Sequence, residues 1–127
     1  FAGEPVKMMS KLTQNLLHGV DYEFVRARRS QNFAVLHEQF GSANQLTLAI
    51  PEGAFMYPLW IKNGAAVRKK LQAEKIYIPT LWPNVLRQLP ENAIEYQLAA
   101  NILPLPIDQR YGVKTMQYIV EKIKNEM

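Results

Sequence analysis

Residues 45–61, QLTLAIPEGAFMYPLWI, decide the fold of this chain. In residues 45–50 every second side chain is a large apolar one, and this period of two predicts a strand. The next three residues, Pro-Glu-Gly, are typical of a turn. Residues 55–61 are apolar at nearly every position, which predicts a second strand covered on both faces. The simplest arrangement pairs the two strands antiparallel, with Pro58 at an open edge or a bulge because it has no N–H to donate.

Helical periodicity lies on both sides of this segment. Gly19 is expected to end a first helix, and Asp21 to cap the second. Arg29 interrupts the apolar stripe of that second helix, so part of its face should be polar or meet another surface. Asn92 and Glu95 resemble a capping box at a later helix start. Apolar spacing predicts helices over residues 6–18, 21–40, 64–74, 92–101 and 112–125.

The remaining segments complete an α+β domain. Residues 75–79 (KIYIP) predict a third, short strand, residues 80–90 an ordered loop, and residues 103–107 (LPLPI) an extended segment. We therefore expect a small three-stranded, mostly antiparallel sheet packed by helices and preceded by a leading helix. The leading helix, residues 1–20, would belong to an inter-domain connection, and residues 21–127 would form the small domain.

Composition excludes several classes of function. The 127 residues are 48% hydrophobic and include no cysteine, which removes disulfides, thiolate metal sites and cysteine nucleophiles. His18 and His37 each lack a second ligand at metal-binding spacing. A reducing, cytoplasmic setting fits this composition best, and we expect the protein there.

Charge and hydropathy give no sign of a nucleic-acid or membrane partner. The net charge is only +4, and the basic runs at residues 26–29 and 68–70 lie in helical patterns, where solvated faces are the usual interpretation. No apolar run approaches the roughly 18 residues of a membrane span. Binding to nucleic acid would require the two basic runs to converge on one face.

No catalytic, cofactor-binding or metal-binding residue is expected in this chain. The scattered glycines form no phosphate-binding loop, and Glu91, Glu95 and Asp108 form no recognisable catalytic pair. The lysines lie on polar helix faces or flank strands, where an ammonium group stays hydrated and is a poor nucleophile.

Residues 77–84, YIPTLWPN, are the candidate site. They leave a strand as a proline-stiffened loop, and stiff loops at strand ends commonly line binding sites. Tyr77, Trp82 and Asn84 are the candidate cleft residues. The alternative is that Trp82 closes the hydrophobic core beneath the loop.

Four stretches, taken in order, resemble the C-terminal small domain of DegT/StrS-type sugar aminotransferases, which are fold-type I enzymes dependent on pyridoxal phosphate. The resemblance extends from about residue 8 to residue 125 and consists mainly of apolar pattern and proline placement. The stretches are the helix of residues 25–36 (VRARRSQNFAVL), the strand of residues 56–61 with the helix through Val67 and Leu71, residues 76–83 (IYIPTLWP) and residues 98–107 (LAANILPLPI).

The resemblance implies a division of labour. The family's large domain carries the lysine that holds pyridoxal phosphate, and no stretch here matches that motif. This chain would instead close one side of the cleft, with Tyr77, Trp82 and Asn84 as its wall. The parent enzyme would transfer an amino group, to a nucleotide-linked keto-sugar, and would be a homodimer. The first residue, Phe1, fits a piece of a longer protein. The alternative is a freestanding, non-catalytic α+β module that binds a small ligand or a protein.

Overall fold

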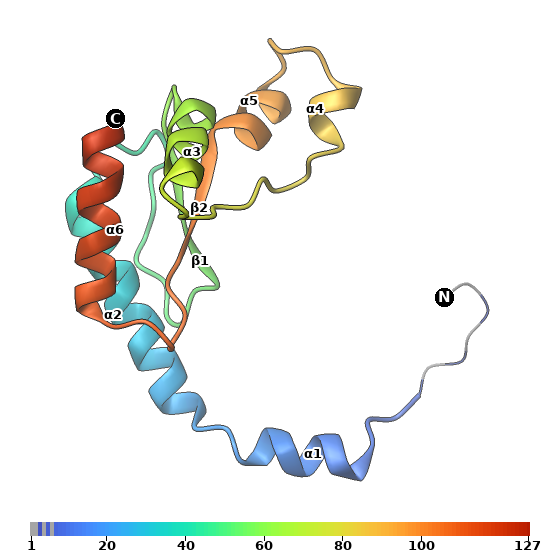
Figure 1. Ribbon diagram of the computed structural model, residues 1–127. Coiled ribbons are helices and arrows are strands. Elements are labelled where there is room, and N and C mark those ends of the chain that lie inside the picture. The colour runs from blue at the N-terminus through green and yellow to red at the C-terminus, as the bar shows by residue number, and fades with distance from the viewer. Residues whose placement is uncertain (1–2, 4, 6) are drawn as a thin grey trace.

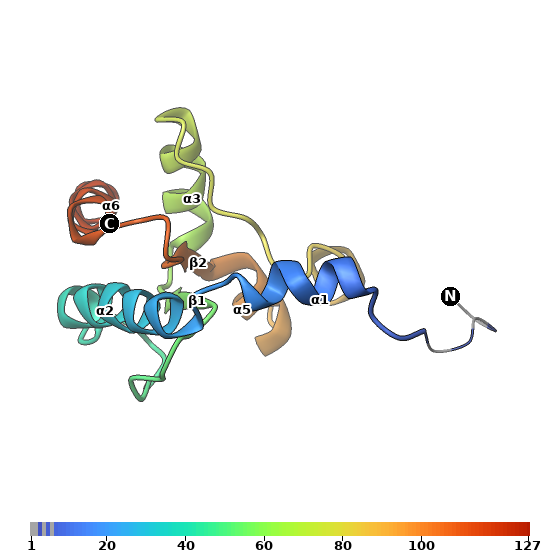
Figure 2. The ribbon, with the colours of Figure 1, turned by 90° about the horizontal axis from the view of Figure 1, so that it is seen from below.

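The computed structural model describes residues 3, 5 and 7–127, and it shows helices packed on a two-stranded antiparallel sheet (Figure 1). The α+β class is confirmed, and the prediction of three strands is wrong. Figure 1 shows α1 apart from the other helices, and in the view from below it crosses in front of α5 (Figure 2). The elements, in chain order, are α1 (Lys11–His18), α2 (Tyr22–Phe40), β1 (Met56–Trp60), α3 (Gly64–Ala73), α4 (Val85–Gln88), α5 (Ile94–Asn101), β2 (Ile102–Pro106) and α6 (Val113–Glu126).

Two prolines stand opposite each other in the sheet and fix its hydrogen-bond pattern. Pro58 in β1 pairs with Pro104 in β2. Neither has an N–H, so this is a pair without ladder hydrogen bonds, and the bonded pairs are those on either side of it. The polar groups of Pro58 and Trp60 therefore face the outer edge of β1, as the position of Pro58 predicts. Accordingly, the Trp60 N–H donates outward to the Oδ1 of Asn44 (3.0 Å).

The predicted strand over residues 45–50 does not form, because a side chain occupies the edge with which it would pair. The Asn44 Nδ2 donates to the Pro58 carbonyl (2.8 Å), while its Oδ1 accepts from Trp60. One backbone bond follows, from the Gln45 N–H to the Trp60 carbonyl (2.9 Å). With the edge groups of β1 engaged in this way, the chain turns away instead of continuing a ladder.

We expect Asn44→Ala to lower the free energy of unfolding by about 1–3 kcal/mol, because it leaves two strand-edge groups of β1 without their partner. Urea denaturation measures the change. Asn63→Ala is the matched control, since the Asn63 amide makes one exposed, long bond to the Met127 carbonyl (3.5 Å). Equal losses in the two variants would show that Asn44 does not secure the strand edge.

The predicted third strand over residues 75–79 is also absent. Ile78 is buried in the core, so the segment lies against the fold. However, Pro104 and Pro106 leave the outer edge of β2 with no N–H at two successive outward positions, and a regular ladder cannot form there. The extended segment predicted over residues 103–107 is the one that becomes a strand.

The helices largely match their predicted spans. The Asp21 Oδ1 caps α2 by accepting from the N–H of Phe24 (2.9 Å), as predicted. The Asn92–Glu95 capping box is wrong: α5 has Ala93 at its N-cap and no side-chain cap. The predicted loop over residues 80–90 contains the short helix α4.

The leading helix is shorter than predicted. Described residues before Lys11 are not helical, because Ser10 caps α1 by accepting from the Thr13 N–H (3.1 Å). Gly19 is its C-cap, as expected. Residues 1, 2, 4 and 6 belong to the predicted leading segment of residues 1–20, and residue 6 also to the predicted helix of residues 6–18; all four lie outside the described residues.

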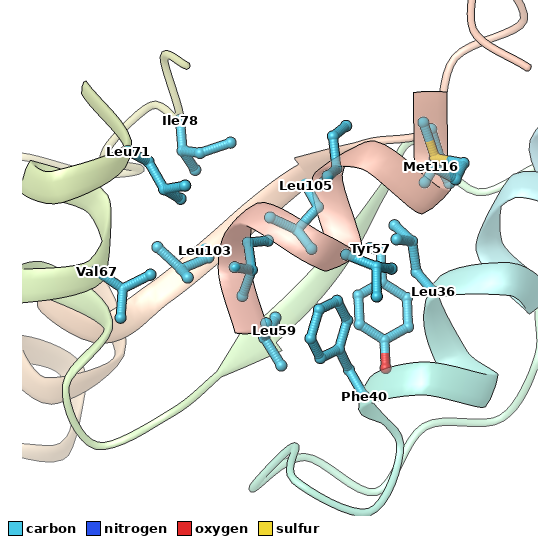
Figure 3. Packing of buried hydrophobic residues seen from close by; sticks show 14 of the residues in the cluster. Leu36, Phe40, Tyr57, Leu59, Val67, Leu71, Ile78, Leu103, Leu105 and Met116 are labelled. Carbon is cyan, nitrogen blue, oxygen red and sulfur yellow. The ribbon is translucent and has the colours of Figure 1, made fainter. Parts of the chain in front are cut away.

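One hydrophobic core joins the sheet to its helices (Figure 3). Alternate residues of β1, Tyr57 and Leu59, are fully buried, whereas the other face of the strand is half-buried, so it is covered on both faces only in part. Burial raises the pKa of the Tyr57 hydroxyl. The main helical contributions are Phe33, Leu36 and Phe40 from α2, Val67 and Leu71 from α3, and Met116, Ile119, Val120 and Ile123 from α6.

Candidate functional site

A groove of about 360 Å³ lies where α2, the start of β1, the loop after α3 and the end of β2 meet. Its walls combine apolar side chains with two guanidinium groups and one carboxylate. The lining residues are Arg29, Phe55, Met56, Tyr77, Pro79, Leu81, Pro104, Pro106, Ile107, Asp108, Arg110 and Tyr111.

Arg29 enters the groove from the middle of α2. The C-terminal half of this helix packs in the core, whereas Tyr22 near its start is 57% exposed, and Arg29 lies where the two parts meet. The half-buried guanidinium donates from Nε to the Gln109 Oε1 and from one terminal nitrogen to the Ala54 carbonyl, both at 3.3 Å. The break in the apolar stripe at Arg29 thus marks a second surface, as predicted.

Asp108 and Arg110 form a local ion pair at one end of the groove. Arg110 donates from Nε and from a terminal nitrogen to the two Asp108 oxygens, at 2.8 and 3.1 Å. This hydrogen bonding, aided by the charges of Arg110 and Arg29, holds the pKa of the Asp108 carboxyl below its usual range. Asp108 therefore serves as a charge partner for arginine and is poorly suited to act as a proton donor near neutral pH.

Asn32, one helical turn after Arg29, holds the loop that carries these groups. Its side chain is fully buried, and its Nδ2 lies within hydrogen-bond distance of the carbonyls of Ile107 (3.2 Å), Asp108 (3.3 Å) and Tyr111 (3.0 Å). The residue thus fixes the end of β2 and the following turn against α2, which sets the position of one groove wall.

The structure separates the three predicted cleft residues. Tyr77 lines the groove and is 73% exposed. Trp82 and Asn84 are not among the lining residues of this groove. The Asn84 side chain donates to the Gln88 Oε1 (3.3 Å), within the turn of α4.

Trp82 does not close the core. Its side chain is 63% exposed, and its φ of 50° places it in the left-handed region that bulky residues rarely adopt. The alternative that placed Trp82 beneath the loop is therefore wrong. Strained backbone of this kind clusters at active sites, ligand clamps and switch regions.

Sequence reasoning missed most of the groove. Phe55 and Arg110 carry no local pattern that separates them from ordinary surface residues. Arg29 did leave a signal, since a charge within an apolar stripe of a helix indicates a polar contact. The loop of residues 77–81 was found because its prolines and aromatics are unusual together.

The described residues offer no metal site of three or more acidic or histidine ligands. His37 lies against the core, with its Nδ1 3.4 Å from the Tyr57 hydroxyl oxygen. Arg68, from the second basic run, turns inward and donates to the Ala100 carbonyl (2.8 Å) and to Ile102. In the described part of the chain, no helix combines the length and the apolar character needed to cross a membrane.

A second surface of interest, called here the apolar face of α1, consists of Leu12, Leu16 and Leu17 on the helix together with Met8 and Met9, which directly precede it. All five residues are exposed, and none of the α1 residues is buried. An eight-residue helix is marginal in water without tertiary packing. This face is therefore the expected contact surface for another folded body.

We expect the isolated chain to self-associate through the apolar face of α1. Leu12→Gln combined with Leu16→Gln should shift the sedimentation-velocity distribution toward monomer, because Leu12 and Leu16 are 70% and 67% exposed. Ile50→Gln, at a residue 59% exposed elsewhere, is the control and should leave the distribution unchanged. A strictly monomeric native chain at high concentration would contradict the prediction.

Comparison with family models, with curated proteins and with solved structures gave no match, so the interpretation of the groove rests on its own geometry.

Proposed function

We propose that this chain is the small domain of a pyridoxal phosphate-dependent aminotransferase of the DegT/StrS type, in which it forms one wall of the substrate cleft. One observation carries the proposal: each of the four stretches that resemble the family contributes to the same groove. Arg29 comes from the first stretch, Met56 from the second, Tyr77 from the third and Pro106 from the fourth. Stretches scattered over 80 residues that converge on one groove are typical of a shared binding surface.

The groove residues do not fit the cofactor itself. No lysine is among the lining residues, and the one carboxylate there, Asp108, is bound by Arg110. The cofactor would accordingly be held by a large domain of the parent protein. Pyridoxal phosphate supplies the electron sink for amino transfer when it is bound. The residues of this chain would bind substrate, orient it and exclude water.

Each surface has a place in this proposal. The apolar face of α1 would pack on the large domain, and the groove with Tyr77 would face the cofactor. Trp82 and Asn84, presented by the neighbouring loop, would extend the wall toward a nucleotide-linked keto-sugar. The parent would be a cytoplasmic homodimer.

Steady-state kinetics on the product of the intact gene test the proposal. With L-glutamate as amino donor and a nucleotide-linked keto-sugar as acceptor, Tyr77→Ala and Trp82→Ala should each raise the KM for the acceptor roughly tenfold. Tyr118→Ala, which removes a half-exposed tyrosine of α6 that lines none of this groove, should leave the KM unchanged. An unchanged KM in the first two variants would contradict the assignment of the wall.

The second candidate function is a freestanding, non-catalytic binding module. It is favoured by the closed core, which joins both strands to α2, α3 and α6 within this chain. The same intact gene product discriminates the two. A module of this kind would bind its ligand without retaining pyridoxal phosphate and without releasing 2-oxoglutarate from glutamate.

A further inference from the structure

We propose that the groove beside Arg29 binds a small molecule that carries a single carboxylate on a flat apolar body. The inference concerns a site that is complete within this chain, so it holds whether or not the aminotransferase proposal is correct. Charge, donor geometry and wall chemistry each lead to this class of ligand.

The fixed charges of the groove leave one positive charge uncompensated. Asp108 is bound in bidentate fashion by Arg110, and these two charges cancel. Arg29 forms no ion pair among the described residues. Its charge does help to lower the pKa of the Asp108 carboxyl. A ligand with one negative charge would neutralise the groove, whereas a dianion would leave a net negative charge in a partly buried place.

The donor geometry of Arg29 favours a carboxylate. Its two acceptors, the Gln109 amide oxygen and the Ala54 carbonyl, are neutral and lie at 3.3 Å, a long distance for a guanidinium donor. They anchor the side chain, and the second terminal nitrogen has no acceptor among the described residues. A guanidinium fork binds carboxylate oxygens in pairs with shorter, stronger bonds, and partial burial limits the screening by water.

The walls of the groove favour a flat apolar body. Phe55 and Tyr77 are 78% and 73% exposed, and neither ring packs on another aromatic ring of the described chain. Leu81 and Pro106 also line the groove and add to its apolar surface. A volume of about 360 Å³ is in the range of small-ligand sites and suits one or two fused rings.

An NMR titration of the 127-residue chain tests the inference with three probes on one ring system: 2-naphthoate, 2-naphthamide and 2-naphthyl phosphate. We expect 2-naphthoate to bind with a Kd of about 1 mM or lower. It should shift the Arg29 Nε–H resonance together with the amides of Tyr77 and Tyr111. The neutral amide should bind at least about tenfold more weakly, because it cannot pair with the guanidinium.

Variants separate the guanidinium from general charge. Arg29→Gln should weaken 2-naphthoate binding about tenfold or more, and Arg29→Lys by less. Arg28→Gln is the matched control. It removes the same charge from the adjacent position of α2, where the guanidinium lies over the Phe24 ring and outside the groove. Tyr77→Ser changes a largely exposed residue and tests the apolar wall even if Arg29→Gln fails to fold.

Several results would overturn the inference. Equal binding of 2-naphthoate and 2-naphthamide would show that Arg29 recognises no charge. Tighter binding of 2-naphthyl phosphate would replace the monocarboxylate by a phosphate ester. Equal losses in Arg28→Gln and Arg29→Gln would indicate nonspecific charge attraction. The absence of saturable shifts up to about 20 mM probe, or shifts confined to other surfaces, would exclude the site.

Discussion

Gly64→Ala is expected to lower the free energy of unfolding by about 3 kcal/mol or more, and no comparably small substitution in the described chain should cost more. A Cβ at Gly64 would lie 1.9 Å from the carbonyl oxygen of Asn101 and 2.7 Å from its carbon. Both are backbone atoms, at the junction of α5 and β2, and they cannot rotate away. The first turn of α3 would have to move.

That movement would break further contacts. The N–H of Ala65 donates to the Asn101 Oδ1 (3.2 Å), and Arg68 donates to the Ala100 carbonyl (2.8 Å). Burial lowers the pKa of Arg68, since the charged guanidinium loses solvent there. Displacing α3 would therefore leave the buried Arg68 guanidinium without its acceptors and would also separate α3 from α5.

Urea denaturation of Gly64→Ala beside Gly19→Ala checks this prediction. Gly19 is the C-cap of α1, with a φ of −79°, and an added Cβ would meet nothing closer than the Leu16 carbonyl oxygen at 3.4 Å. Gly19→Ala should change stability by less than about 0.5 kcal/mol. If both variants unfold at the same urea concentration as the native chain, α3 does not approach α5 as described.

Asn32→Leu is expected to cost about 2–4 kcal/mol, the second-largest effect. Leucine retains the shape of the side chain but removes the amide donor that faces the carbonyls of Ile107 and Tyr111. The Asp108 carbonyl would lose one of two donors, since it also accepts from the Tyr111 N–H (3.1 Å). Two acceptors at the turn after β2 would lose their partner, and the third would keep only the Tyr111 N–H. The same loss should loosen the turn that carries Arg110, so binding of 2-naphthoate should weaken in parallel with stability.

Asn32→Asp distinguishes lost hydrogen bonds from lost packing. A carboxylate facing three carbonyls is strongly disfavoured, so the pKa of this Asp would be raised in the folded state. A raised folded pKa means that the stability contribution is present at low pH and is lost as pH rises through that pKa. Asn32→Asp should therefore be less stable than Asn32→Leu at pH 7, and the gap should narrow toward pH 4. If the difference in unfolding free energy between the two variants did not depend on pH, the Asn32 amide would not hold the turn through hydrogen bonds to its carbonyls. We call this set of hydrogen bonds the Asn32 clamp.

The helices were predictable because their apolar residues recur at helical spacing and the same residues are buried in the core. In α6, Met116, Ile119, Val120 and Ile123 recur at helical spacing, and all four are buried. Two features of α2 could also be predicted from the sequence. The Asp21 cap depends only on neighbouring residues, and Arg29 stands out as a charge within an apolar stripe.

The strand pairing of the sheet was less predictable, because single side chains at the strand edges decide which segments can pair. The alternation in residues 45–50 is real, yet Asn44 occupies the edge that such a strand requires. Likewise, Pro104 and Pro106 have no N–H to donate, so residues 75–79 cannot form a regular hydrogen-bond ladder with β2. For both predicted strands, the groups at the sheet edges outweighed a local pattern. The capping box at Asn92 is a separate error: the residue type suits a cap, but α5 has Ala93 at its N-cap.

The candidate groove was predictable only where the sequence was unusual. Tyr77 belongs to a rare combination of aromatics and prolines, and it does line the groove. Arg29 and Arg110 are separated by about 80 residues and come together through β2 and the Asn32 clamp. No pattern in one sequence indicates such a long-range meeting.

The facing prolines of the sheet have a consequence for behaviour at high concentration. Exposed strand edges can template the addition of strands from other molecules, which leads to amyloid-like aggregation. Here the edge of β1 is covered by Asn44, and that of β2 offers no N–H at Pro104 or Pro106. Any clustering of this chain in concentrated solution should therefore be helical in its contacts and reversible on dilution, and should not seed fibrils.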